Sequence, residues 1–133
     1  YSSGVPLDYA NPVHMDEIAI KYPELNIVLA HLGHPWMGQT IALIRKEHNL
    51  YADISALYYR PWQFYNAMQL LVEYGTWGKV FFGSDYPFTL PQESIEGVRN
   101  MNHIVRGTGL PPIPEEVIEG ILHQESFAIL GIQ

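Results

Sequence analysis

Three short apolar runs, separated by segments with helical spacing, constrain the fold of this chain more than any other feature. The runs cover residues 27–31, 50–55 and 79–83, and the first reads Ile-Val-Leu-Ala-His. Apolar runs of about five residues are typical of strands that are buried on both faces, as in parallel sheets. Parallel neighbours must be joined by a crossover, usually a helix. The order therefore predicts an α/β fold with three parallel strands.

Helical spacing and punctuation residues set the expected bounds of the helices. We expect the first ten residues to form a loop, and helices over 12–22, 35–49, 61–74, about 89–101 and 115–130. Asn49 is a plausible left-handed stop for the second of these helices, and Gly75 for the third. Thr89 with Gln92 resembles a capping box for the fourth.

Three strands make an incomplete sheet within what we expect to be one domain, residues 1–133. A complete (β/α)8 TIM barrel takes about 250 residues, so the chain is either one end of such a barrel or a small open sheet. A net charge of −7 with only seven Lys and Arg argues against nucleic acid or an anionic membrane as a partner. No apolar run approaches the ~20 residues of a membrane span, and we expect a cytoplasmic protein. Without cysteine, any metal must be held by nitrogen and oxygen ligands.

Ionisable residues end or follow two of the three strands. His31 ends the first, and Asp85 follows the third in the segment Gly-Ser-Asp-Tyr-Pro. The carboxyl ends of parallel strands gather at one edge, where the sites of α/β proteins are built. We therefore predict that His31 and Asp85 are catalytic residues and metal ligands. Asp85 would take the proton of a metal-bound water, and His31 would either ligate the metal or polarise a substrate carbonyl. The structural alternatives are a core histidine and an aspartate that caps a turn.

Three further residues are predicted to contact a substrate. Arg60 lies in the loop after the second strand, and its planar guanidinium matches a substrate carboxylate in a bidentate way. A structural ion pair with Asp53 or Glu93 explains Arg60 equally well. His34 begins the next helical segment, where it either contacts substrate or caps the helix, and Tyr86 follows Asp85 directly.

Taken together and in order, four segments of the chain resemble one protein family. They are His31-Leu-Gly-His-Pro-Trp36, Tyr51-Ala-Asp-Ile-Ser55, Phe82-Gly-Ser-Asp-Tyr-Pro-Phe88 and Ile121-Leu-His-Gln-Glu-Ser-Phe-Ala-Ile-Leu-Gly131. The chain is similar to the C-terminal half of the amidohydrolase-2 family, which comprises metal-dependent (β/α)8-barrel hydrolases and decarboxylases. The resemblance implies that the three strands are barrel strands six to eight.

The resemblance also implies a role for each strand-end residue. His31 corresponds to the histidine that ends strand six, which faces the substrate or a second metal and assists proton transfer. Asp85 corresponds to the strand-eight aspartate, a metal ligand and general base. The strand-one His-x-His pair and the strand-five histidine of the family are absent from this chain. The implied cofactor is a divalent metal, with zinc expected. Catalytic zinc usually takes three protein ligands plus water.

Three functions are therefore considered for this chain. The first is a hydrolase that attacks a small, carboxylated cyclic or aromatic substrate with a metal-activated water; the second is a nonoxidative decarboxylase (lyase) of the same family. The third is a noncatalytic, self-associating α/β domain. As a fragment the chain is expected to be inactive, with Val28, Leu29, Phe81 and Phe82 covered by the missing N-terminal half or by another subunit of a homo-oligomer.

Overall fold

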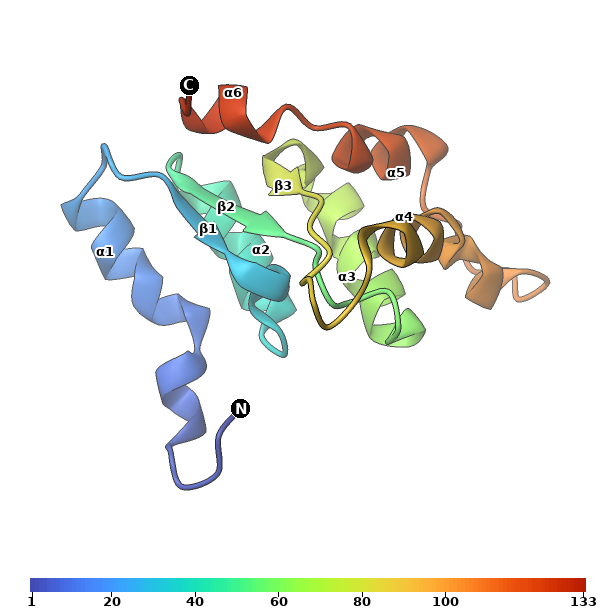
Figure 1. Ribbon diagram of the computed structural model, residues 1–133, viewed down its shortest axis with the longest axis horizontal. Helices are drawn as coiled ribbons and strands as arrows, with labels where there is room; N and C mark the ends of the chain where they lie inside the picture. The colour runs from blue at the N-terminus through green and yellow to red at the C-terminus, as the bar shows by residue number, and fades with distance from the viewer.

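Three parallel strands form one open sheet in the computed structural model, which describes residues 1–133 (Figure 1). The strand order is β1 (Ile27–Leu29), β2 (Leu50–Asp53), β3 (Val80–Phe81). Residues 27 to 29 pair in register with residues 50 to 52, and residues 52 and 53 pair with residues 80 and 81. The predicted α/β fold with three parallel strands is confirmed.

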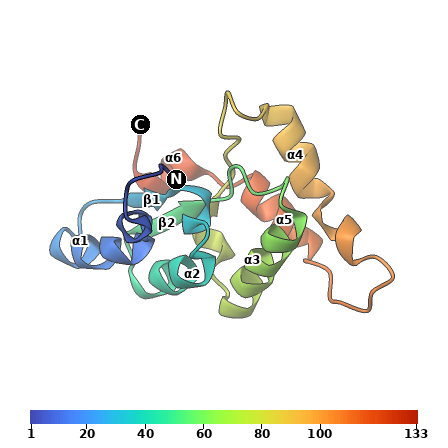
Figure 2. The ribbon, with the colours of Figure 1, turned by 90° about the horizontal axis from the view of Figure 1, so that it is seen from below.

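Helices join the strands and continue beyond the last one. The α-helices are α1 (Met15–Lys21), α2 (Met37–Lys46), α3 (Pro61–Tyr74), α4 (Pro91–Arg99), α5 (Glu115–Leu122) and α6 (Ser126–Leu130). Short 3-10 helices are η1 (Leu7–Ala10), η2 (Pro12–His14), η3 (Ala30–Gly33), η4 (Trp77–Lys79) and η5 (Met101–Val105). Figure 2 shows α2 and α3 on one side of the sheet and α6 on the other. No helix combines the length and the apolar character needed to cross a membrane.

The core lies between the sheet and the helices that cover one of its faces. Leu50 and Ala52 of β2 are fully buried, whereas Tyr51 and Asp53, which alternate with them, are half-buried. This alternation follows from the two-residue period of a strand. Helices α2 and α3 contribute buried apolar side chains at helical spacing, namely Ile41, Leu43, Ile44, Phe64, Ala67, Met68 and Leu71. The sheet therefore has a covered face toward the helices and an opposite face with fewer neighbours.

The opposite face is less exposed than the sequence predicts. Val28 is 38% exposed, as expected for a residue on an open inner face. Leu29 and Phe81 are only 8% and 5% exposed. Leu29 pairs with Ala52 on the helix-covered side, and Phe81 stacks on Tyr51 with ring centroids 5.5 Å apart. Phe82 is half-buried. The prediction of an open inner face is therefore wrong for Leu29 and Phe81.

Several predicted boundaries are wrong in informative ways. The first ten residues include a 3-10 turn over Leu7–Ala10, and the expected C-terminal helix is interrupted between Leu122 and Ser126. Thr89 forms no capping box. Its hydroxyl instead donates to the carbonyl of Ser84 and contacts the hydroxyl of Ser94, while Leu90 precedes α4 without a side-chain cap.

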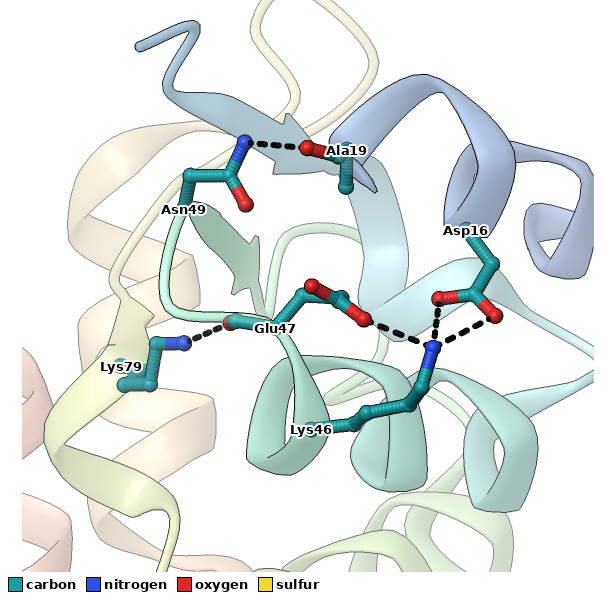
Figure 3. Close-up of polar contacts among 6 residues, drawn as sticks. All are labelled: Asp16, Ala19, Lys46, Glu47, Asn49 and Lys79. Atoms are coloured by element: carbon teal, nitrogen blue, oxygen red, sulfur yellow. Dashed lines mark hydrogen bonds and ion pairs between the residues drawn. The ribbon is translucent and has the colours of Figure 1, made fainter. Parts of the chain in front are cut away.

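Asn49 serves a purpose other than the predicted left-handed stop. Helix α2 ends at Lys46, and Asn49 is absent from the residues with positive φ. Its buried amide donates to the carbonyls of Ala19, Tyr22 and Leu25, at 3.2, 3.1 and 2.9 Å. Figure 3 shows the first of these bonds. Asn49 thus fastens the end of α1 and the turn after it to the start of β2.

Two lysines complete this polar cluster at the edge where the strands begin (Figure 3). Lys79 donates to the carbonyls of Ile44 and Glu47 at the end of α2, at 2.6 and 2.5 Å. Burial lowers the pKa of Lys79 from its ordinary value, and the charge of Glu47 opposes part of that effect. Lys46 forms ion pairs of 2.7 Å with both Asp16 and Glu47. These contacts hold α1, α2 and η4 together at the edge opposite the carboxyl ends of the strands.

Candidate active site

A pocket of about 290 Å³ opens where the carboxyl ends of the strands meet the loops that follow them. Four of the five residues predicted to carry chemistry line it: His31, His34, Arg60 and Asp85. Tyr86 does not line it and is 70% exposed. The remaining lining residues are Tyr1, Ala56, Leu57 and Tyr59. Sheet topology thus brings together His31 and Asp85, which are 54 residues apart in the sequence.

An unusual backbone turn carries His31 into the pocket. β1 ends at Leu29, and within η3 both His31 and Leu32 have positive φ, 56° and 49°. Left-handed conformations cost non-glycine residues about 1–2 kcal/mol each. The turn is held by the backbone N–H of His31, which donates to Oδ1 of Asp53 at 3.0 Å, and by the complete burial of Leu32.

One nitrogen of the His31 ring is fixed and the other is without a partner. Nδ1 lies 2.7 Å from the hydroxyl of Ser55 and 3.1 Å from its carbonyl oxygen. The Ser55 hydroxyl donates in turn to Oδ1 of Asp53 at 2.5 Å. Nε2 makes no hydrogen bond within the chain, so it is the nitrogen available to a ligand in the pocket.

Asp85 also has positive φ, 65°, in the loop that follows β3. Its carbonyl accepts from the N–H of Phe88 at 2.9 Å, which closes the turn through the backbone. The carboxylate takes no part in this turn and makes no hydrogen bond or ion pair with the chain. The alternative of a turn-capping side chain therefore does not describe Asp85, whose carboxylate is available in the pocket.

Arg60 is anchored without using a carboxylate. Its Nη1 donates to the carbonyl of Ala56 at 2.8 Å, and the guanidinium lies 4.6 Å from the centre of the Tyr59 ring. The structural alternative, an ion pair with Asp53 or Glu93, does not form. The remaining guanidinium donors are free for an anionic ligand.

His34 differs from His31 because both of its ring nitrogens have partners in the chain. Nδ1 lies 2.9 Å from the hydroxyl of Tyr1, and Nε2 lies 2.7 Å from Oε1 of Gln63. The same tyrosine hydroxyl donates to the His34 carbonyl at 2.7 Å. Burial raises the pKa of the Tyr1 phenol, and the nearby charge of Arg60 opposes part of that effect. His34 therefore belongs to the pocket wall, with both ring nitrogens occupied by hydrogen bonds within the chain.

The structure adds partners that sequence reasoning did not find. The sequence indicates Ser55 only as the end of the second strand, yet Ser55 and Asp53 both contact His31. Their spacing of two residues is a usable signal once β1 and β2 are known to be neighbours. Tyr1 and Gln63 gave no signal, because their contacts with His34 depend on the folding of loops.

The donors in the pocket fit part of a metal site. Nε2 of His31 and the carboxylate of Asp85 are donor types that zinc accepts, and both are without partners in the chain. No group of three His, Cys, Asp or Glu side chains is arranged to hold a metal ion. Catalytic zinc usually takes three protein ligands plus water, so these residues fit such an ion as two ligands of a larger set.

A family model described as Amidohydrolase matches residues 1–131. The chain belongs to the amidohydrolase-2 family. The predicted membership is thereby confirmed, and members of the wider amidohydrolase superfamily are generally metal-dependent. No curated protein matches the chain.

Two solved structures are similar to this amidohydrolase-2 chain. One is an uncharacterized TIM-barrel protein from Bordetella bronchiseptica, with a TM-score of 0.67 and 24% identity, covering 98% of this chain and 43% of that one. The other is 5-carboxyvanillate decarboxylase LigW from Sphingomonas paucimobilis, with a TM-score of 0.60 and 18% identity, covering 91% of this chain and 38% of that one. The chain thus spans about two fifths of each. The prediction of a partial (β/α)8 barrel is confirmed.

Proposed function

We propose that residues 1–133 contribute to the active site of a metal-dependent hydrolase of the amidohydrolase-2 family. One observation carries the proposal: His31 and Asp85 line one pocket, and neither Nε2 of His31 nor the carboxylate of Asp85 has a partner in the chain. A bound divalent cation, with zinc the expected metal, would supply the Lewis acidity that activates water or polarises a carbonyl. His31 and Asp85 would hold it, together with ligands from outside these residues.

The remaining roles follow from what each side chain has free. Asp85 accepts the proton that the attacking water loses, since an ionised carboxylate is an acceptor. Arg60 binds a carboxylate of the substrate through its unused guanidinium donors, and Tyr59 supports that guanidinium from one face. His34 and Tyr86 are proposed as further substrate contacts, His34 from the pocket wall and Tyr86 from outside it. A volume of about 290 Å³ suits a small cyclic or aromatic carboxylate.

A nonoxidative decarboxylase is the second candidate. The similarity in fold to a 5-carboxyvanillate decarboxylase supports it, and so does the position of Arg60, because a decarboxylase must also bind a carboxylate. The two reactions differ in their products. Release of carbon dioxide from an aromatic carboxylate, with no hydrolysis of amide or ester analogues, would favour decarboxylation.

We also propose that a further stretch of polypeptide, outside residues 1–133, covers the open side of this sheet and supplies the remaining metal ligands. The rest of a barrel is the expected partner, and a second copy in a homo-oligomer is the alternative. Both solved structures are more than twice as long as the part that this chain matches. Val28 on the sheet and Phe127 on α6 are exposed apolar side chains that this additional polypeptide would cover.

Metal content tests the proposal, measured on the full-length protein after purification without chelators and accompanied by its intact mass. We expect about one divalent ion per chain, lost in His31→Ala and in Asp85→Ala. His14→Ala is the matched control, because His14 is an exposed histidine paired with Asp8 and lies outside the pocket. Metal retained in both pocket variants would contradict the proposed ligands. A protein with no metal affinity would instead support the noncatalytic, self-associating domain.

Arg60→Lys tests the proposed contact with a carboxylate. Lysine keeps the charge but loses the planar fork, so we expect KM for a carboxylated substrate to rise about tenfold, equivalent to ~1.4 kcal/mol of binding. Metal content should stay unchanged, because Arg60 donates hydrogen bonds and ligates nothing. An unchanged KM would remove Arg60 from the substrate site.

A further inference from the structure

His31 is held at two points by a carboxylate and a hydroxyl from the end of β2. We infer that Asp53 and Ser55 are positioning residues that fix the neutral His31 ring as its Nδ1–H tautomer. Nε2 is then the lone-pair nitrogen presented to the pocket. This arrangement would give a catalytic or ligating histidine a single defined donor atom.

One oxygen of Asp53 organises the whole arrangement. Its Oδ1 accepts from the backbone N–H of His31 at 3.0 Å, from the backbone N–H of Ser55 at 3.0 Å and from the Ser55 hydroxyl at 2.5 Å. The bond to its own i+2 neighbour is an ordinary Asx turn. The bond to His31, 22 residues earlier in the chain, is not explained by such a turn. It fixes the left-handed backbone from which the imidazole projects.

Counting hydrogens determines the tautomer. The Ser55 hydroxyl has one hydrogen, and the carboxylate beside it can only accept, so that hydrogen points to Asp53. Toward His31 the hydroxyl oxygen is therefore an acceptor, at 2.7 Å from Nδ1. The Ser55 carbonyl, 3.1 Å from the same nitrogen, is also an acceptor. Nδ1 must donate, and in a neutral ring Nε2 then carries no hydrogen.

The segment that follows the neighbouring strand leaves room for this pair. Gly83 follows β3, and a Cβ atom there would lie 3.3 Å from Cβ of Ser55 and 3.8 Å from Cγ of Asp53. A carbon at 3.3 Å is tighter than ordinary contact, so the glycine leaves just the room that the Ser55 side chain occupies. A residue larger than glycine at position 83 would therefore crowd the Ser55 side chain.

Nitrogen NMR of the imidazole tests the inference directly. The measurement is a two-bond ¹H–¹⁵N correlation on labelled, full-length protein with a chelator present, at about pH 8.5, well above the ~6.5 at which an ordinary histidine titrates. We expect Nδ1 of His31 at a protonated shift and Nε2 at an unprotonated one. In Asp53→Ala the freed hydroxyl hydrogen can point to Nδ1, so both shifts should move toward the opposite tautomer.

Ser55→Ala is the second variant, because it keeps both N–H bonds to Asp53 and so preserves the turn if Asp53→Ala unfolds. It removes the nearer acceptor, and we expect a smaller movement in the same direction. Asp8→Ala is the control: Asp8 contacts His14, so only the His14 resonances should change. A wild-type His31 protonated at Nε2 would overturn the inference, as would wild-type shifts in both Asp53→Ala and Ser55→Ala.

The inference depends on the proposed function only for the use of the Nε2 lone pair. The tautomer is read without metal and without substrate, whereas the proposed function is tested by metal content. A protein without metal affinity but with the Nδ1–H tautomer would contradict the proposed function alone. If the protein binds metal but the ¹⁵N shifts of His31 are the same in Asp53→Ala, Ser55→Ala and the parent, only the positioning roles are contradicted.

Discussion

Asn49 makes more hydrogen bonds to the backbone than any other side chain at the edge where the strands begin. It is 1% exposed, and its two N–H groups serve three carbonyls of α1 and the following turn. Replacing Asn49 with alanine removes both donors. A buried carbonyl that loses its partner costs about 1–3 kcal/mol, which for two donors gives ~2–6 kcal/mol.

A compensating gain lowers that figure. The Oδ1 atom of Asn49 is buried without a hydrogen-bond partner, and its removal returns about 1 kcal/mol or more. We therefore expect Asn49→Ala to lower the free energy of unfolding by about 1–5 kcal/mol. That is a large share of the ~5–15 kcal/mol typical of a folded domain.

Denaturant unfolding followed by far-UV circular dichroism measures this loss as a lower midpoint at unchanged slope. Asn66→Ala is the matched control, because the exposed Asn66 amide donates to the carbonyl of Trp62 within α3 at 2.7 Å. That variant should stay within about 0.5 kcal/mol of the parent. Asn49→Asp keeps the volume of the side chain and removes the donors. If aspartate were tolerated while alanine was not, lost packing rather than lost donors would explain the effect, and our reasoning would be refuted.

Two further predictions concern backbone crowding and pH. Gly33 and Gly75 have nearly equal φ, 65° and 66°, but a Cβ at Gly33 would collide with Thr40 and with Pro12, whereas Gly75 faces open space. Gly33→Ala should cost about 2–4 kcal/mol and Gly75→Ala about 1; equal losses in the same unfolding assay would exclude the collision. Burial lowers the pKa of Lys79, so between that pKa and 10.5 the unfolded chain binds more protons and stability rises with pH. The stability of the parent minus that of Lys79→Met should therefore increase across this window, and a decrease would show that burial does not control this lysine.

Elements with strong local signals could be predicted from the sequence. α3 spans Pro61–Tyr74 as expected, and Gly75 ends it in the left-handed conformation with φ 66°. Proline at the first turn and glycine after the last are signals that the helix itself contains. Asn49 shows the limit of this approach, because asparagine after a helix suggests a left-handed stop. Its actual contacts are with carbonyls 24 to 30 residues earlier, which no local pattern contains.

The composition of the pocket was predictable to a similar degree. The strand-end rule alone brings His31 and Asp85 to one edge, and the structure places both in the pocket. The rule does not predict the left-handed backbone at His31 and Leu32, because the intrinsic preference of both residues opposes it. A tertiary hydrogen bond that the backbone N–H of His31 donates to Asp53 offsets that preference. Local propensity thus fails where a distant residue holds the backbone of the candidate site.

The two edges of the sheet differ in whether their polar side chains have hydrogen-bond partners in the chain. Where the strands begin, every side-chain hydrogen bond that Asn49 and Lys79 donate goes to a carbonyl of the chain itself. Where the strands end, Nε2 of His31 and the carboxylate of Asp85 have no partner. Polar groups without partners contribute nothing to folding and cost stability if they are buried, so packing does not explain their positions. Under the proposed function, metal and substrate would supply those partners, as in barrels whose N-terminal face stabilises the fold while the opposite face carries the site.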